Sequence, residues 1–338
     1  PDTDGDGVSD GAEVQHGTDP LNSSDVPSPL RVSVTSGGTE GDGFSEFPAV
    51  SGDGRYATFK TFATNLAPTD ANGSLEDVLL KDLLTGALSQ VSVDSLGTGG
   101  NSTSELSDIS SDGRYIAFDS YASDLIGTDT NGDQDVFLHD TQTGTTTRVS
   151  TGNAGVEGND WSWNPSVSNN GRYVAFQSLY AFTPADTNGL PDIYRKDVTG
   201  GTLAFVSRSN AGAAGIGNSE NPVISPDGRF VVFESAADNI ATGDSNGDWD
   251  ILLQDVQTFE AEVVSTDSAG NQANGSSYDP AISDDLRYVV FESLANNLVT
   301  PTVPGDVQIY LKDRRTGETK LLTFSHDGSN SGVGDLTS

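Results

Sequence analysis

The chain has 338 residues and a formal net charge of −34 at pH 7, with 34% hydrophobic residues and no cysteine. This acidity argues against binding to nucleic acid or to an anionic membrane surface, since both attract Lys and Arg, and it favours cations, high-salt surroundings or basic partners. No apolar run approaches the roughly 18 residues that a membrane helix needs, and disulfides are excluded.

The first element in chain order is an acidic segment, residues 1–28, whose pattern predicts a calcium-binding loop. Oxygen-bearing residues alternate through a twelve-residue stretch, Gly7 allows a sharp turn at the sixth position, and the final glutamate can bind calcium through both oxygens. The predicted ligands are Asp2, Asp4, Asp6, Val8 through its carbonyl, Asp10 and Glu13. The alternative is a solvated acidic linker without metal.

The same segment resembles the thrombospondin type 3 family of acidic repeats. The residues that carry the resemblance are the DxDGDGxxDxxE pattern from Asp2 and the GTDP step at residues 17–20. The resemblance covers about 25 residues and implies an extracellular linker stiffened by calcium. Because position 1 is not Met, we expect the chain to begin inside a longer product, so a missing signal peptide says nothing about secretion.

Residues 29–338 repeat with a period of 57 to 59 residues. The repeated cores are PAVSGDGRYATF, SDISSDGRYIAF, PSVSNNGRYVAF, PVISPDGRFVVF and PAISDDLRYVVF, with arginines at 55, 114, 172, 229 and 287. Each repeat predicts a strand, a tight turn, a second strand of the RYVAF type, a long loop, a third strand such as DVFLHD, a TG turn and a fourth strand. We expect the recurring arginine to close the first turn against an acidic neighbour.

Four short strands repeated at this interval predict an all-β fold, a β-propeller of four-stranded antiparallel blades. The SxDGRYVAFxS cores and DTNGxxDVFLxD loops resemble TolB-like, WD-like propeller repeats of secreted and periplasmic bacterial proteins. The resemblance implies the fold but does not indicate one function, because such propellers serve as binding modules, as non-catalytic partners of peptidases and as surface-protein domains.

The number of fourth strands raises the question of how the ring closes. Six segments read as fourth strands, but only five repeats contain the first three strands. We expect five blades, because an open ring would expose two apolar blade faces, and a six-bladed ring of which this chain is a fragment is the alternative. Either residues 30–35 or residues 320–324 are then expected to extend a blade edge or to pair across a protein contact.

The long loops before the third strands contain a DxNG pattern that resembles the calcium loops of integrin-type propellers. Two loops have four oxygen donors, and two have fewer. The complete sets are Asp129, Asn131, Asp133 and Asp135, and Asp244, Asn246, Asp248 and Asp250; the incomplete sets are Asp70, Asn72 and Asp77, and Asp186, Asn188 and Asp192. The alternative is a structural turn, in which Asp and Asn make Asx turns, Gly takes a left-handed conformation and the last Asp bonds the backbone of a neighbouring blade.

The long-loop face also contains aromatic residues that are candidates for ligand binding. Trp161 and Trp163 alternate along a strand-like segment, so both side chains are expected on the same side, and Tyr278 lies in an equivalent loop. They predict either a stacking platform for a sugar or peptide, or packing at the mouth of the propeller.

A catalytic site is not expected. The three histidines, His16, His139 and His326, do not occupy equivalent repeat positions, and no HExxH, GxSxG or phosphate-binding motif occurs. A pair of carboxylates could still act as a glycoside hydrolase does.

The sequence therefore predicts a non-catalytic, extracellular or cell-surface calcium-binding propeller that serves in binding or assembly in a bacterial surface or secreted protein. Its expected partners are a protein or carbohydrate on the long-loop face, or further copies through strand pairing, but not nucleic acid or a membrane. A lectin-like carbohydrate binder, a structural subunit of a cell-surface polymer and a glycoside hydrolase are the alternatives.

Overall fold

The structure, a computed structural model, describes residue 21 and residues 30–67, 70, 72–127, 129–300 and 306–323. These residues form five separate four-stranded antiparallel sheets, and each sheet uses four consecutive strands. The strands are β1 Ser45–Val50, β2 Tyr56–Thr61, β3 Asp77–Asp82 and β4 Leu88–Gln90 in blade 1; β5 Ser104–Ile109, β6 Tyr115–Ser120, β7 Asp135–Asp140 and β8 Thr145–Arg148 in blade 2; β9 Ser162–Val167, β10 Tyr173–Ser178, β11 Asp192–Asp197 and β12 Leu203–Phe205 in blade 3; β13 Ser219–Ile224, β14 Phe230–Ser235, β15 Asp250–Asp255 and β16 Ala261–Val263 in blade 4; and β17 Ser277–Ile282, β18 Tyr288–Ser293, β19 Gln308–Asp313 and β20 Thr319–Leu321 in blade 5.

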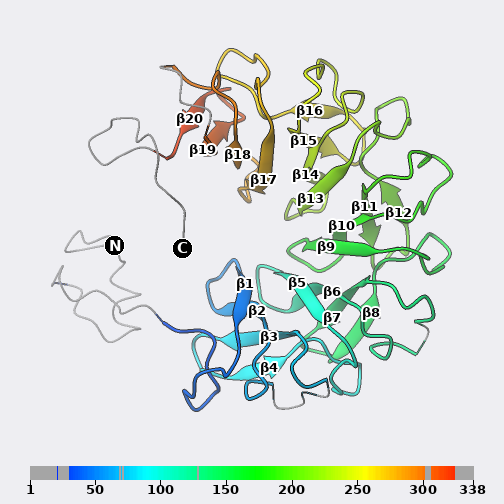
Figure 1. Ribbon diagram of the computed structural model, residues 1–338, viewed down its shortest axis with the longest axis vertical. Helices are drawn as coiled ribbons and strands as arrows, with labels where there is room; N and C mark the ends of the chain where they lie inside the picture. The colour runs from blue at the N-terminus through cyan, green and yellow to red at the C-terminus, as the bar shows by residue number, and fades with distance from the viewer. Residues whose placement is uncertain are drawn as a thin grey trace.

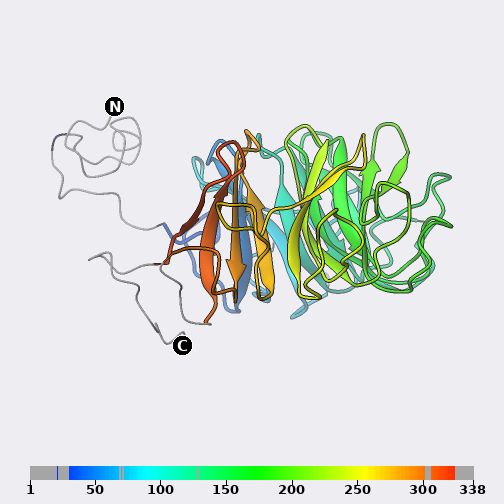
Figure 2. The same ribbon diagram turned by 90° about the horizontal axis from the view of Figure 1, so that it is seen from above.

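The five blades follow one another around a central axis, with the first strand of each blade innermost (Figure 1). The described part of the chain is therefore an all-β, five-bladed propeller, as the repeat period predicts. Figure 2 shows the propeller from its side, with the strands running between its two faces. In the described ranges there is no helix long and apolar enough to cross a membrane.

The recurring arginine ties the two tight turns of each blade together. In blade 2, Arg114 follows the first turn and donates to both oxygens of Asp140 at the end of β7, over 2.9 and 2.7 Å. The prediction of an acidic partner for this arginine is confirmed in every blade; the other pairs are Arg55 with Asp82, Arg172 with Asp197, Arg229 with Asp255 and Arg287 with Asp313.

Apolar side chains fill the space between adjacent blades. Between blades 2 and 3, Val136 and Leu138 of β7 pack with Phe176 of β10 and Tyr194 of β11, and all four side chains are buried. Equivalent clusters join blades 1 and 2, blades 3 and 4, and blades 4 and 5. Burial of this apolar surface, at about 25 cal/mol per Å², is the main force that holds neighbouring blades together.

The first and last blades do not meet in this way. Among the described residues no strand of blade 5 packs against a strand of blade 1, and Figure 1 shows the blue and red ends of the propeller apart. Strand β1 is mostly exposed, whereas β5 is buried at both ends. Five blades are present as predicted, but the reason given for that number, burial of every blade face in a closed ring, is wrong for the described residues.

The structure also settles which fourth-strand segment is spare. Residues 319–321 form β20, the regular outer strand of blade 5, so Lys320 lies at a blade edge. Residues 30–35 belong to none of the five sheets and make one isolated bridge, Val34 with Glu40. Phe324 lies outside the described residues.

Candidate functional site

The DxNG loops lie on the face predicted for them, against the loops that connect consecutive blades. Asn131, Asn188 and Asn246 each donate a side-chain hydrogen bond to a carbonyl of the following inter-blade loop, over 2.9 to 3.0 Å. The side-chain oxygen of each asparagine accepts a backbone N–H two residues on, over 2.9 Å. The loop glycines, Gly73, Gly132, Gly189 and Gly247, have φ between 66° and 76°.

These contacts confirm the turn role of the loops, with one correction. The last aspartate of each loop was predicted to bond the backbone of a neighbouring blade. Instead it accepts a hydrogen bond from a serine that follows the fourth strand of its own blade: Asp77 from Ser92, Asp135 from Ser150, Asp192 from Ser207 and Asp250 from Ser265. The reason is geometric, because this aspartate begins the third strand and the fourth strand ends beside it.

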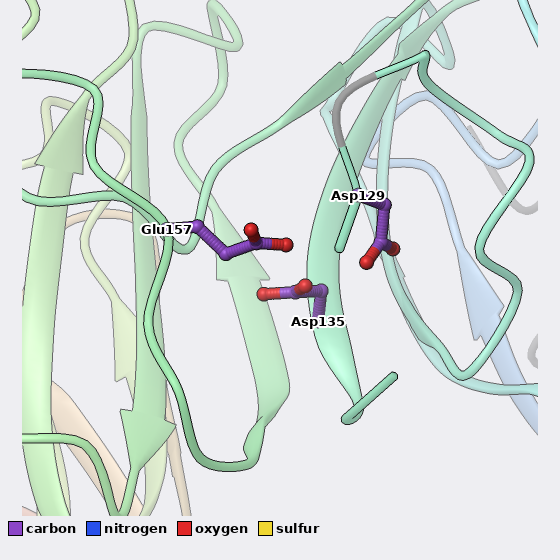
Figure 3. A group of neighbouring side chains, drawn as sticks. All are labelled: Asp129, Asp135 and Glu157. Atoms are coloured by element: carbon purple, nitrogen blue, oxygen red, sulfur yellow. The ribbon is translucent and has the colours of Figure 1, made fainter. Parts of the chain in front are cut away.

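Blade 2 contains a cluster of three carboxylates, which come from two loops and one strand (Figure 3). Asp129, Asp135 and Glu157 each offer an oxygen within 4.8 Å of the others, close enough to share a cation. Glu157 comes from the inter-blade loop and was not predicted. Its position is Glu40, Gly99, Ala214 and Gln272 in the other repeats, so no constant residue type marks it.

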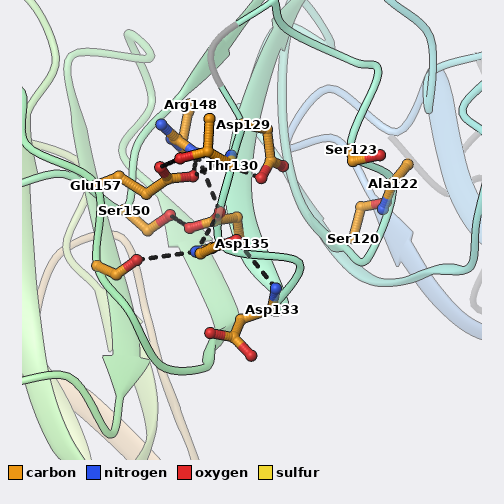
Figure 4. Close-up of polar contacts among 12 residues, drawn as sticks. Ser120, Ala122, Ser123, Asp129, Thr130, Asp133, Asp135, Arg148, Ser150 and Glu157 are labelled. Atoms are coloured by element: carbon orange, nitrogen blue, oxygen red, sulfur yellow. Dashed lines mark hydrogen bonds and ion pairs between the residues drawn. The ribbon is translucent and has the colours of Figure 1, made fainter.

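Arg148 of β8 already supplies a positive charge to this cluster (Figure 4). Its guanidinium bonds Glu157, lies 3.2 Å from Asp135 and is 3.7 Å from Asp129. Burial and the neighbouring Asp135 raise the pKa of Asp129 to about 6. Although burial alone would raise the pKa of Glu157, hydrogen bonds from Thr130 and Arg148 lower it to about 2.

The four predicted donors of this loop do not converge on one point. The oxygen of Asn131 accepts the N–H of Asp133, and Figure 4 shows the Asp133 carboxylate directed away from Arg148. Calcium needs six to eight oxygens around it, and here a guanidinium stands among the carboxylates instead. The residues of this loop therefore do not fit a calcium ion while Arg148 is in place.

In blade 4 a neutral amide at the position of Glu157, not an arginine, bonds the paired carboxylates. Gln272 donates to both Asp244 and Asp250, each over 2.7 Å. Burial raises the pKa of Asp244 to about 6 and also raises the pKa of Asp250. Asp248 contributes its backbone N–H to the Asx turn of Asn246. The pair of carboxylates is thus satisfied by the protein itself.

In the two incomplete loops, other side chains donate hydrogen bonds to the aspartates. In blade 1, Gln90 donates to Asp77 over 2.7 Å, and Asp70 accepts the N–H groups of Asn72 and Gly73. Burial raises the pKa of Asp77 to about 6.

In blade 3, the Tyr194 hydroxyl donates to Asp186, and Asn188 donates to Asp192 over 2.8 Å. Burial raises the pKa of Asp192 to about 7. One oxygen of Asp186 is buried without a hydrogen-bond partner.

The predicted aromatic residues do not form one platform. Trp161 is 47% exposed, just before β9, whereas Trp163 lies within β9, half-buried and opposite Gln177. Tyr278 packs instead against Trp249, which precedes β15, with ring centroids 6.1 Å apart. The described residues contain no ring contact between either predicted tryptophan and Tyr278. Of the three predicted aromatic residues, Trp161 is the one whose side chain is exposed, whereas Trp163 and Tyr278 are partly buried.

His139 has a structural role. It is buried on β7, and its Nδ1 lies 2.9 Å from the Thr146 hydroxyl, which donates to the Val93 carbonyl. Burial lowers the pKa of His139. His16, His326 and the six predicted calcium ligands between Asp2 and Glu13 lie outside the described residues.

The N-terminal segment matches a protein family, and the propeller is similar to solved structures. Residues 2–23 match the bacterial TSP3 repeat family, and no curated protein matches the chain. Among solved structures, a putative TolB from Agrobacterium tumefaciens is 19% identical with a TM-score of 0.50, over 83% of this chain and 80% of that chain.

Two further structures have slightly lower scores. TolB from Acinetobacter baumannii is 18% identical, with a TM-score of 0.49 over 85% of this chain and 56% of that chain. An oligogalacturonate lyase in complex with manganese is 15% identical, with a TM-score of 0.49 over 84% of this chain and 68% of that chain. Residues 2–23 therefore match the bacterial TSP3 repeat. The described propeller has a TolB-like fold.

Proposed function

We propose that the chain is a non-catalytic, extracellular module of a bacterial surface or secreted protein, in which residues 1–28 bind calcium and residues 29–338 serve in binding or assembly. The observation that carries this proposal is the bacterial TSP3 match at residues 2–23, because it spans all six predicted ligands. These ligands are hard oxygens at the spacing that calcium prefers. A calcium-binding repeat of this kind also supports export.

Calcium is assigned to the N-terminal loop and not to the propeller loops. In the propeller, the Arg148 guanidinium lies 3.2 Å from Asp135 and 3.7 Å from Asp129, and Gln272 donates to both Asp244 and Asp250. A calcium ion there would have to displace a buried guanidinium or a doubly bonded amide, and each lost contact costs about 1–3 kcal/mol.

A non-catalytic role agrees with the side chains of the long-loop face. The last aspartate of each long loop accepts a hydrogen bond from a serine of its own blade, and the buried His139 lies against the Thr146 hydroxyl. A catalytic carboxylate must instead reach a substrate.

Limited proteolysis with and without a chelator tests the calcium assignment. Chelation is expected to speed cleavage within residues 1–28 and to leave cleavage of the propeller unchanged. The Asp6→Ala variant should be cleaved equally fast in both conditions, and Asp129→Ala should behave like the parent chain. Equal cleavage of the parent chain with and without calcium would refute the assignment.

A carbohydrate-binding role is a second candidate, favoured by the exposure of Trp161. A glycan array with the parent chain and with Trp161→Ala tests it, and Trp163→Ala serves as the matched control because Trp163 is half-buried in β9. Binding that disappears only in Trp161→Ala would support this role, and no binding by the parent chain would exclude it.

A further inference from the structure

The loop that precedes each blade normally caps the fourth strand of that blade. A side-chain oxygen of this loop accepts a backbone N–H near the start of the strand, over 2.6 to 3.0 Å. The four pairs, with the loop residue first, are Ser36 with Leu88, Ser95 with Thr146, Asn153 with Leu203 and Ser268 with Thr319. The corresponding residues before and in blade 4 are Asn210 and Ala261, and within the described ranges no hydrogen bond joins them.

A second contact is missing at the same interface. Lys81, Lys196 and Lys312, on the third strands of their blades, each donate to two carbonyls of the preceding loop. Gln254 has this position on β15, and it is fully buried with neither amide atom in a hydrogen bond. The carbonyl of Arg208, at the equivalent place in the loop, accepts no hydrogen bond from any residue that the structure describes. The loop is therefore not tied to blade 4 as the other loops are to their blades.

Two unusual residues accompany this loss. Phe259 stands where the other TG turns have glycine and keeps the left-handed conformation, with φ of 58°, which is rare for a bulky side chain. Arg208 replaces the valine or threonine of the other loops, and its guanidinium lies 3.6 Å from the centre of the Phe259 ring. The Nε of Arg208 is buried without a hydrogen-bond partner. Stacking of these two side chains thus joins the loop to the turn where the regular hydrogen bonds are absent.

A cleft of about 580 Å³ lies at this interface. It is beside β16, the outer strand of blade 4 (Figure 1). Its walls are residues 209–211 of the preceding loop, residues 238–244 of the long loop of blade 4, and Glu260 and Ala261. Pockets that hold small molecules have volumes of about 300–1,000 Å³, so the cleft is large enough for a ligand.

Several groups in the walls of the cleft have no hydrogen-bond partner in the described part of the chain. The backbone N–H of Ala261 is a donor, the Asn210 amide and the Thr242 hydroxyl can both donate and accept, and the Glu260 carboxylate accepts. Asp238 uses one oxygen for the N–H of Gly247, over 3.2 Å, and its other oxygen remains available. The cleft therefore offers donors and acceptors together.

These groups favour a neutral ligand that is rich in hydroxyl groups. The carboxylates of Asp238 and Glu260 repel anions. They do not hold a metal ion together, because the one group of three acidic side chains that lies close enough among the described residues is in blade 2. An apolar ligand would leave the polar groups of the walls without partners. A hydroxyl can donate to a carboxylate and accept from an N–H, so sugars match this set.

We propose that the cleft between blades 3 and 4 binds a neutral mono- or disaccharide. One hydroxyl accepts the Ala261 N–H, in the place that a loop side chain has in the other blades, and another donates to the Glu260 carboxylate. The site is separate from the calcium loop proposed for residues 1–28 and from the exposed Trp161, neither of which lines the cleft.

Titration of the full chain with neutral sugars, followed by saturation-transfer NMR, tests the proposal. The probes are glucose, galactose, N-acetylglucosamine, maltose, cellobiose and lactose. At least one should bind the parent chain, and Glu260→Ala should raise its Kd about tenfold, which is about 1.4 kcal/mol. Glu318→Ala is the matched control and should bind like the parent chain, because Glu318 has the same turn position in blade 5, where Ser268 caps Thr319.

Gln254→Lys supplies a second test that does not depend on removing a contact. The lysine should donate to the loop carbonyls as Lys196 does, bring Asn210 onto the Ala261 N–H and close the cleft. This variant should therefore melt at a higher temperature than the parent chain and yet bind none of the sugars.

Trp161→Ala distinguishes this cleft from the long-loop face and should bind like the parent chain. The proposal is overturned if no probe binds the parent chain, or if binding is unchanged in Glu260→Ala or in Gln254→Lys. Loss of binding in Trp161→Ala would also overturn it, because the sugar would then lie on the long-loop face. None of these results bears on the calcium assignment, which the proteolysis experiment tests separately.

Discussion

Arg148 holds three carboxylates together inside blade 2, and its removal has an effect that can be measured directly. Arg148→Ala leaves Asp129, Asp135 and Glu157 close together without a cation, and breaking a buried ion pair in this way costs about 3–5 kcal/mol. Urea unfolding at pH 8 should show this loss. The matched control is Arg172→Ala, because Arg172 is about half exposed and its pair with Asp197 should contribute less than about 1 kcal/mol.

The same variant tests how this cluster relates to metal. With the guanidinium removed, calcium can take its place, and a ligand that binds only the folded state raises stability by RT ln(1 + [L]/Kd). Millimolar calcium is therefore expected to raise the Tm of Arg148→Ala more than the Tm of the parent chain, by differential scanning calorimetry. An equal calcium response in both would show that the three carboxylates cannot hold the ion.

Gln254 is a second residue for which comparison with the other repeats predicts how a substitution changes the free energy of unfolding. Its side chain is fully buried, and neither its amide oxygen nor its amide nitrogen has a partner. Lysine at the equivalent positions 81, 196 and 312 donates to loop carbonyls of the preceding blade. Gln254→Lys should therefore raise the free energy of unfolding by about 1 kcal/mol. Lys196→Gln is the reverse change and should lower it; a loss of stability in Gln254→Lys would contradict this explanation.

At the scale of the strands, the acceptor on the second strand should matter only where a next blade is present. Glu234→Ala leaves the N–H of Asp279 without an acceptor and removes one of the two acceptors of the Asn221 side-chain amide, which costs about 1–3 kcal/mol. Glu292→Ala is the matched control, since Glu292 faces no blade among the described residues, and its effect should be within about 0.5 kcal/mol. Equal losses in the two variants, measured by urea unfolding, would show that Glu292 has a partner.

The strands themselves follow from local patterns, but the contacts of the loops do not. The RYVAF cores, the Gly-containing turns and the TG turns predict each four-stranded meander, because every strand pairs with its neighbour in sequence. The donors that satisfy the loop aspartates come from elsewhere in the blade and differ between repeats: Gln90, Arg148, Tyr194 and Gln272. No single motif could mark them. Local sequence patterns also cannot predict whether the first and last blades touch, because this depends on the sum of the small rotations between successive blades.

For the whole molecule, buried carboxylates predict an unusual dependence of stability on pH. Burial raises the pKa of Asp119, Asp192 and Glu234 to about 7. A carboxyl with a raised pKa binds its proton more tightly in the folded state, so the stability it contributes is lost as pH rises from about 4 to 7. Arginine partners lower the pKa of Asp82 and Asp140 to about 2, and that stability is lost as pH falls from about 4 to 2.

The Tm is therefore expected to be highest near pH 4–5 and to fall on both sides. Glu234→Gln should reduce the fall between pH 5 and 8, because glutamine already makes the equivalent contact at position 177 and cannot titrate. A Tm that rises steadily from pH 5 to 8 in the absence of calcium would contradict the burial of these carboxyls.

The most direct test of the central claim, that calcium belongs to the N-terminal loop and not to the propeller, is the calcium stoichiometry from isothermal titration calorimetry on the full chain. One twelve-residue loop predicts one ion per chain. The Asp2→Ala, Asp6→Ala double variant should lose that ion, and the Asp129→Ala, Asp244→Ala double variant should keep it with unchanged affinity. Loss of the ion in the propeller variant, with the N-terminal variant still binding, would contradict the account.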